Sequence, residues 1–138
     1  MRHALFTSFK NVGRRVTRPR KAILGVLERT RSPMSASDIH TALKREKTSV
    51  DLVTIYRTLS VFIELGLVVR MEFQEGQFRY ELCHGREHHH HIRCLGCGHI
   101  TDLLICPLQK LLTLVERQTR FLVEGHALEF FGRCPQCR

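Results

Sequence analysis

The chain has 138 residues, of which 43% are hydrophobic and 25% charged, so it is long enough for one globular domain or two small ones. No apolar run approaches the roughly 20 residues that span a bilayer. The N-terminal stretch lacks the apolar core and cleavage site of a secretory signal, so we expect a cytoplasmic protein with no membrane partner.

The net charge of +9 is confined to the first half of the chain. Residues 1–70 carry 14 Lys and Arg against 5 Asp and Glu, whereas residues 71–138 carry 8 of each. This asymmetry fits a polyanionic partner such as nucleic acid, or a basic surface that only aids solubility. Charge alone does not choose between these two interpretations.

Two helices are predicted near the start of the chain. The first begins with Thr17 or Arg18 as its cap and Pro19 in its first turn, and it runs to about residue 29. The second begins at Ser35, which forms a capping-box pattern with Asp38 three residues later.

A third helix is predicted from residue 51 to 65. Asp51 is its expected cap, and Gly66 is a stop signal. Apolar side chains recur along it at helical spacing, which predicts a buried stripe of Leu52, Tyr56, Leu59 and Ile63.

A β-hairpin is predicted next, with strands at 67–73 and 78–82 and a turn at 74–77. Three helices followed by a hairpin are typical of a winged helix-turn-helix, and the basic charge of this segment favours DNA binding. The third helix would enter the major groove, and Tyr56 has core packing as an equally weighted alternative role. The candidate DNA contacts are Arg15, Arg18, Arg20, Thr54, Tyr56 and Arg57.

The second half reads as a small α/β unit, which makes the whole chain α+β. Strands are predicted at 88–94 and 100–104 around a Cys-x-x-Cys-Gly turn, then a helix from Pro107 to about residue 119, then a strand at 121–131.

Metal-ligand chemistry is concentrated in this second half, because all six cysteines and seven of the nine histidines lie beyond residue 82. Three disulfides are disfavoured in a protein expected to be cytoplasmic. Two Cys-x-x-Cys turns instead predict a structural zinc site, with a redox pair or free thiols as alternatives. Its expected ligands are Cys94, Cys97, Cys134 and Cys137.

Four consecutive histidines precede the first of these turns. In a strand they alternate, so His89 and His91 face one side and His88 and His90 the other.

The first histidine pair lies near Cys83 in sequence. Its possible further ligands are Glu81, Glu72, Asp102 and His84. One thiolate with two imidazoles suits zinc, whereas a purely nitrogen and oxygen set leaves iron or manganese open.

The second histidine pair could form a third metal site with His126. Cys106 belongs to neither Cys-x-x-Cys pair, and we expect it to be a buried structural cysteine.

An enzyme is not expected, because the zinc-deaminase pattern, serine-hydrolase signatures and phosphate-binding glycine loops are missing from the sequence. A basic DNA-binding half joined to a metal-binding half favours a metal sensor. A zinc-storage or chaperone protein is the alternative from another class.

Six stretches extend over nearly the whole chain and resemble the ferric uptake regulator (Fur) superfamily: RVTRPRKAIL, MSASDIHTAL, LVTIYRTLSVFIELGLV, RYELC, HHHHIRCLGCGHITD and HALEFFGRCPQC. The resemblance implies a homodimeric, metal-responsive repressor. Residues 1–82 would be the winged-helix domain that binds operator DNA, residues 83–91 a hinge, and residues 92–138 the dimerisation domain.

The resemblance also implies residue roles. The four cysteines of the two turns match the family's structural zinc site, His89 and His91 match its regulatory site, and Tyr56 with Arg57 match the base-contacting part of its recognition helix.

Two features of the sequence bear on which metal is sensed. Iron- and peroxide-sensing members usually carry a histidine just before the second helix, where this chain has Pro33 and Met34. Cys83 with His89 and His91 is similar to the sensor site of zinc uptake regulators, although no ligand stands near Val69. We therefore expect zinc as the sensed metal.

Iron or manganese is the alternative, because Glu81 matches a ligand of the iron sensors. A further family site of three histidines and a glutamate would here comprise His88, His90, Gln109 and His126, so the glutamate is replaced.

Overall fold

The computed structural model describes residues 15–30, 32–83 and 87–138. The chain divides into two units, Met1–Arg86 and Glu87–Arg138. This boundary falls within the predicted hinge 83–91, whose residues 84–86, including His84, lie outside the described part. His90 and His91, at the other end of that range, already belong to a strand of the second unit. That residues 83–91 act as a hinge stays a prediction.

Side-chain caps begin the three helices of the first unit: α2 (Arg18–Arg29), α3 (Ala36–Arg45) and α4 (Leu52–Glu64). Thr17 caps α2, with Pro19 in the first turn. Ser35 and Asp38 exchange side-chain-to-backbone hydrogen bonds of 2.9 and 3.1 Å at the start of α3. Asp51 accepts a 2.8 Å hydrogen bond from the Thr54 N–H at the start of α4. The predicted helix starts are thus confirmed.

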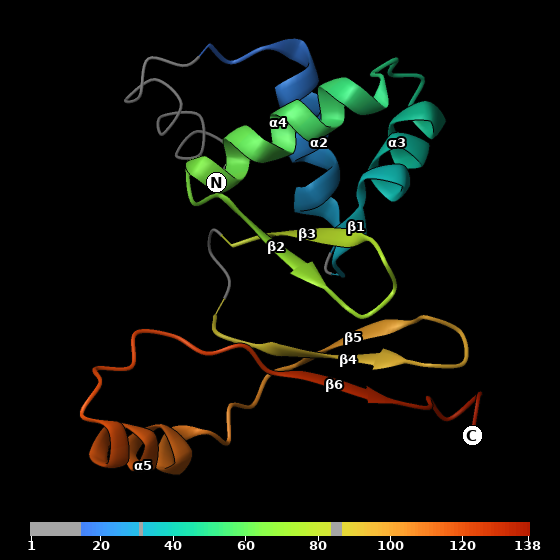
Figure 1. Cartoon of the computed structure of the whole chain (residues 1–138). Coiled ribbons are helices and arrows are strands. Elements are labelled where there is room, and N and C mark those ends of the chain that lie inside the picture. Colours follow the sequence, from blue (N-terminus) through green and yellow to red (C-terminus); the bar gives the residue numbers. More distant parts are fainter. Residues whose placement is uncertain (1–14, 31, 84–86) are drawn as a thin grey trace. The chain divides into compact units, whose positions relative to one another are not determined.

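A three-stranded antiparallel sheet completes this unit, in the order β1-β3-β2. The strands are β1 (Met34–Ser35), β2 (Val68–Glu72) and β3 (Phe78–Leu82). Figure 1 shows α2, α3 and α4 crossing one another beside this sheet, which is the winged helix-turn-helix arrangement. The hairpin was predicted, but β1 was not, because two residues carry no readable pattern.

The core of the first unit forms where the three helices meet. Its fully buried side chains include Ile23, Leu24, Ile39, Leu43, Ile55, Leu59 and Phe62. The predicted stripe of α4 is wrong except for Leu59, since Tyr56 is 51% exposed and Leu52 and Ile63 are also exposed. Apolar residues occur around most of the circumference of α4. Helical spacing alone therefore predicted a face next to the one that is buried.

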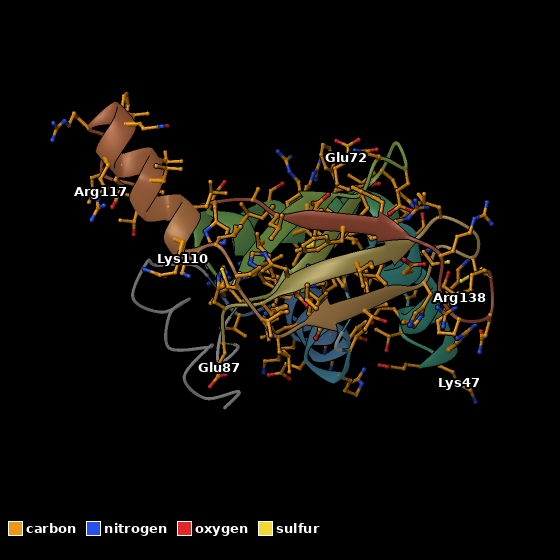
Figure 2. The ribbon with its side chains drawn as sticks, turned by 90° about the horizontal axis from the view of Figure 1, so that it is seen from below. Lys47, Glu72, Glu87, Lys110, Arg117 and Arg138 are labelled. Carbon is orange, nitrogen blue, oxygen red and sulfur yellow. The ribbon has the colours of Figure 1, made fainter. Side chains whose placement is uncertain are left out.

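The second unit contains another three-stranded sheet, in the order β5-β4-β6, whose face is seen in Figure 2. Its strands are β4 (His90–Cys94), β5 (Ile100–Leu103) and β6 (Glu129–Gly132). β5 runs antiparallel to β4, and β6 runs parallel to it. The predicted strand at 121–131 is therefore mostly wrong: residues 121–128 are not extended into the sheet, and pairing begins only at Glu129 opposite His91.

Helix α5 (Gln109–Thr119) has no buried residue. Figures 1 and 2 show it standing clear of the sheet of its own unit. Leu111, Leu114 and Val115 are exposed along it. Among the described residues, no helix is long and apolar enough to cross a membrane.

Candidate metal centres and nucleic-acid interface

Four cysteine thiols come together at the end of the second unit's sheet. Cys94 ends β4, and the parallel pairing of β4 with β6 places it opposite Gly132, two residues before Cys134. The Leu95 N–H donates a 2.7 Å hydrogen bond to the Gly132 carbonyl and continues this alignment beyond the strands. The sulfur atoms of Cys94, Cys97, Cys134 and Cys137 all lie within 4.8 Å of one another.

The spacing of these sulfurs fits a tetrahedral zinc ion. A Zn–S bond of about 2.3 Å implies sulfurs about 3.8 Å apart in a tetrahedron, and Cys97 Sγ lies 3.8 Å from Cys134 Sγ. Gly96 allows this approach, because a Cβ added there would lie 2.8 Å from Cys137 Cβ and 3.0 Å from its Sγ. A side chain at position 96 would therefore push the two turns apart.

The pKa values of two of these thiols, Cys94 and Cys137, are shifted in opposite directions. Hydrogen bonds from the Cys134 N–H, at 3.3 Å, and from other N–H groups of the two turns lower the pKa of Cys94 to about 5. Hydrogen bonding with the sulfurs of Cys134, Cys97 and Cys94 raises the pKa of Cys137 to about 12. Cys94 is therefore favoured as a thiolate, whereas Cys137 must lose its proton before it can bind a cation.

A second group of ligands lies on one side of the chain at the start of β4, with His89 just before the strand and His91 within it. The rings of His89 and His91 are 4.9 Å apart, as strand alternation predicts. His91 is buried and pairs with Asp102 across β4 and β5, so that His91 Nε2 lies 3.7 Å from Asp102 Oδ1. His89 Nδ1 lies 2.8 Å from the Glu87 carbonyl oxygen. The second unit thereby presents two imidazoles and one carboxylate that can bind a divalent cation.

The remaining expected ligands of this group belong to the first unit. Glu81 is buried in β3, opposite Val69. Cys83 follows β3, is exposed, and donates its N–H to the Leu67 carbonyl at 2.9 Å. Partial burial of the sulfur raises the pKa of the Cys83 thiol. Glu72 is exposed at the end of β2. Their participation in a regulatory site stays a prediction.

A third group gathers around His90, on the opposite face of β4. His90 Nε2 lies 3.1 Å from His88 Nε2 and 3.3 Å from His126 Nε2. Burial lowers the pKa of His90, and the neighbouring His88 and His126 lower it further. The structure therefore brings together the three histidines that were expected to form a third site.

Cys106 also belongs to this third group, and its expected role as a buried structural cysteine is wrong. Its thiol is exposed, and its Sγ lies 3.5 Å from His126 Nε2. This proximity could not be predicted from the sequence, because Cys106 and His126 lie in irregular segments before and after α5. No periodicity relates distant residues in such segments. Gln109 stands exposed at the first position of α5.

The candidate DNA contacts fall into two sets in the first unit. Tyr56 and Arg57 project from α4 as exposed side chains. Thr54 is half-buried, and its hydroxyl donates a 2.8 Å hydrogen bond to Asp51, so it serves the helix cap. The hydrogen bonds that Asp51 accepts from the Thr54 N–H and from the Thr54 hydroxyl lower the pKa of Asp51.

The second set lies at the start of α2. Arg15 and Arg18 are exposed, whereas Arg20 is half-buried and its guanidinium donates to the Arg15 carbonyl. A basic pocket that was not predicted from the sequence lies between α3 and α4, where His40, Lys44 and Lys47 line it beside Asp51. It presents further positive charge near the N-terminus of α4, as a DNA-backbone contact requires.

Comparison with known proteins identifies the family. The Ferric uptake regulator family profile matches residues 11–131. The ferric uptake regulation protein of Legionella pneumophila is 35% identical over 130 residues, covering 94% of this chain and 95% of its own.

Two solved structures are similar over nearly the whole chain. The Vibrio cholerae ferric uptake regulator has a TM-score of 0.81 at 28% identity and covers 93% of this chain and 98% of its own. The Francisella tularensis regulator, solved with iron, has a TM-score of 0.79 at 30% identity and covers 91% of this chain and 95% of its own.

These matches agree with the α+β fold of a winged-helix unit followed by a smaller mixed unit. Members of the family are dimeric DNA-binding regulators and not enzymes. The chain therefore belongs to the ferric uptake regulator family and is a metal-responsive, DNA-binding transcription regulator.

Proposed function

We propose that the protein is a zinc-responsive repressor, in which zinc bound by His89, His91 and Cys83 raises the affinity for operator DNA. The observation that carries this proposal is the pairing of the His89 and His91 rings on one side of the chain at the start of β4, apart from the four-cysteine group. Cys83 precedes His89 by six residues, and one thiolate with two imidazoles suits zinc. Asp102 and Glu81 are the candidates for the remaining ligand. Because the target is operator DNA, we expect the protein in the cytoplasm.

The four-cysteine group is proposed to hold a structural zinc ion. The sulfur spacing and the close approach at Gly96 support a tetrahedral thiolate site. Bound there, zinc would tie the Cys134–Cys137 turn to the end of β4, in a segment that would otherwise fray.

DNA recognition is proposed to rest on α4, with Tyr56 and Arg57 directed at base edges. Arg15, Arg18 and Arg20 supply charge for the phosphate backbone, and Thr54 caps the helix that presents them. Zinc would act by fixing residues 83–91 and with them the spacing of the two winged helices in the dimer, so that metal and DNA bind cooperatively.

A second candidate is iron or manganese sensing, and it is favoured by Asp102. The His91–Asp102 distance of 3.7 Å offers a carboxylate to an ion bound by His89 and His91, and a set without Cys83 is made of nitrogen and oxygen only. The Francisella relative was solved with iron. Zinc is preferred here because Cys83 adds a thiol and because position 33, just before β1 and α3, holds Pro33 in place of a histidine.

An anaerobic DNA-binding titration with Zn²⁺, Fe²⁺ and Mn²⁺ tests this proposal. We expect zinc to strengthen operator binding in the wild type, and Cys83→Ser to abolish most of that gain. A response to Fe²⁺ or Mn²⁺ that survives Cys83→Ser but is lost in Asp102→Asn would replace zinc with the second candidate. Operator affinity that ignores every metal, with zinc still bound, would favour a zinc-storage protein instead.

A further inference from the structure

The β2–β3 hairpin of the first unit, which is the wing of the winged helix, is tied to the start of α3 by one side chain. Arg79, in β3, is mostly buried, with 16% of its side chain exposed. Its guanidinium donates 3.2 Å hydrogen bonds to the Pro33 carbonyl and to Asp38. It also pairs with both carboxylate oxygens of Glu75 in the wing turn, with one of these bonds at 3.1 Å. Arg79 thus joins the wing turn to the segment before β1 and to the first turn of α3.

Both carboxylates that meet Arg79 are held by other groups as well. Asp38 Oδ2 accepts a 2.9 Å hydrogen bond from the Ser35 N–H, as part of the capping box of α3. Glu75 has only 10% of its side chain exposed and accepts a 3.2 Å hydrogen bond from the Gln77 side chain. An arginine that makes two bonds to one carboxylate within such a network fixes geometry better than a single exposed ion pair does.

The wing turn bends through backbone conformations that favour an external tie. Gln74 has a φ of 55° and Gly76 a φ of 71°. Positive φ is uncommon for residues other than glycine, so the conformation at Gln74 costs free energy. Glu75 lies between these two residues, and its ion pair with Arg79 therefore acts where the wing changes direction.

One face of the wing leads from the core out to solvent. The strand register pairs Arg70 with Tyr80, and Phe78 lies on the same face two residues before Tyr80. Tyr80 is buried in the core, whereas Arg70 and Phe78 are exposed. The Arg70 guanidinium lies over the Phe78 ring, 4.3 Å from its centroid. This cation–π contact restricts a long, exposed side chain to one arrangement.

The same face lies beside the recognition helix α4. Burial raises the pKa of Tyr80, the nearby Tyr56 raises it further, and the nearby Arg70 lowers it, so both residues lie close to the Tyr80 hydroxyl. Tyr56 is an exposed residue of α4. The wing therefore places a cation, Arg70, next to the side chains of α4 that are proposed to contact DNA.

The charges on this face make its position important. Glu72, labelled in Figure 2, is exposed on the same face and pairs with Phe78 in the strand register. A DNA phosphate is attracted by Arg70 and repelled by Glu72. The wing therefore favours DNA only where it is held with Arg70 toward the phosphate backbone.

We propose that Arg79 is a positioning residue for operator binding, which holds the wing through Glu75 and Asp38 so that Arg70 contacts a backbone phosphate beside α4. Arg79 pairs with Met71 in the strand register, so it lies on the face of the wing opposite to Arg70 and acts without touching DNA. The proposal rests on the DNA binding of the family and is independent of which metal is sensed.

A double-mutant cycle on the full-length protein tests this proposal. Operator affinity is measured by fluorescence anisotropy at several salt concentrations, with the metal that gives the tightest binding at saturation. Arg70→Ala should weaken binding and lower the salt slope by about 1, as the loss of one phosphate contact requires. Arg79→Met should weaken binding by about twofold or more, the lower limit of coupling within one network. In the Arg70→Ala background, Arg79→Met should have no further effect.

Arg29→Met is the matched control. It also removes one arginine of the first unit that pairs with a carboxylate, but its partner, Glu46, lies at the other end of α3 from Asp38. It should leave the operator affinity unchanged. Thermal unfolding of each variant shows that folded proteins are compared.

Glu75→Gln tests the same ion pair from the side of the wing turn, and it covers the case in which Arg79→Met does not fold. Removing a negative charge from the wing would by itself strengthen DNA binding, because DNA is a polyanion. The proposal predicts the opposite sign, a loss of affinity that again disappears in the Arg70→Ala background.

Two results would overturn the proposal. One is an equal loss from Arg79→Met in the wild-type and Arg70→Ala backgrounds, and the other is tighter operator binding by Glu75→Gln. An operator affinity that does not respond to zinc, with the coupling between Arg79 and Arg70 intact, would contradict the proposed zinc sensing and support the role of the wing.

Discussion

His90 and His91 are consecutive residues of β4, both are buried, and they face different groups of metal ligands. His90 meets His88, Cys106 and His126, whereas His91 meets His89 and Asp102. The two-residue period of a strand separates them, so one short run of histidines contributes to two sites. Variants of adjacent residues should consequently have separable effects.

Gly96→Ala is predicted to weaken the structural zinc site. The added methyl group would lie 2.8 Å from Cys137 Cβ, and we expect a loss of about 1–3 kcal/mol from overpacking. Zinc release to a chromogenic chelator, together with thermal unfolding, measures it. Gly125→Ala is the matched control, because nothing lies within 4 Å of a Cβ there. Equal zinc-release rates in the two variants would count against the site.

Zinc binding by the four cysteines is predicted to release protons and to weaken as the pH falls. Cys94, with its pKa of about 5, is already a thiolate at neutral pH, whereas Cys137, with its pKa raised to about 12, must lose a proton to bind. The zinc-bound form holds fewer protons than the metal-free form, so raising the pH favours zinc. Calorimetry in buffers of different ionisation enthalpy should show net proton release between pH 6 and pH 8, because the Cys137 thiol remains protonated in this range. Zinc affinity independent of pH would contradict this assignment.

Two kinds of basic residue in the first unit should affect DNA binding differently. Arg57→Ala, on the exposed face of α4, should cost about 1–3 kcal/mol and relax discrimination among operator variants. Lys44→Ala, in the pocket between α3 and α4, should weaken all sequences alike and lower the salt slope by about 1. Anisotropy titrations at several salt concentrations distinguish the two. Lys110→Ala on α5, labelled in Figure 2, is the control and should change neither quantity. A uniform loss in Arg57→Ala would remove it from base recognition.

Leu114→Asp is predicted to weaken the dimer. Leu111, Leu114 and Val115 form an exposed apolar strip on a helix that buries nothing within its own chain, and such strips mark protein interfaces. Sedimentation velocity should show more monomer at micromolar concentration. Arg117→Asp, a charged position on the same helix, should remain as dimeric as the wild type. If Leu114→Asp stays fully dimeric, the contact lies elsewhere.

The sequence predicts this fold best where local chemistry decides the structure. Thr17, Ser35 and Asp51 locate the helix starts because a capping side chain acts within three residues. The buried face of α4 was missed because it depends on where α2 and α3 pack, and Tyr56 is left outside that contact.

The candidate sites show the same difference between features set by local structure and features set by tertiary structure. Strand alternation separates the histidines of β4 correctly, since that period is local. That Cys106 belongs to the group around His90 was not predicted, because only the tertiary structure around α5 brings it close to His126, twenty positions further along the chain. The shortness of β6 is likewise set by its partner, since β4 itself has only five residues.

The most direct test of the central claim compares His91→Ala with His90→Ala in an anaerobic operator-binding titration with zinc. For the wild type we expect zinc to strengthen DNA binding by about 5- to 150-fold, the usual range of allosteric coupling. His91→Ala should lose this gain, and His90→Ala should keep most of it. Retention of the full zinc response in His91→Ala, with the four-cysteine site loaded, would contradict the account.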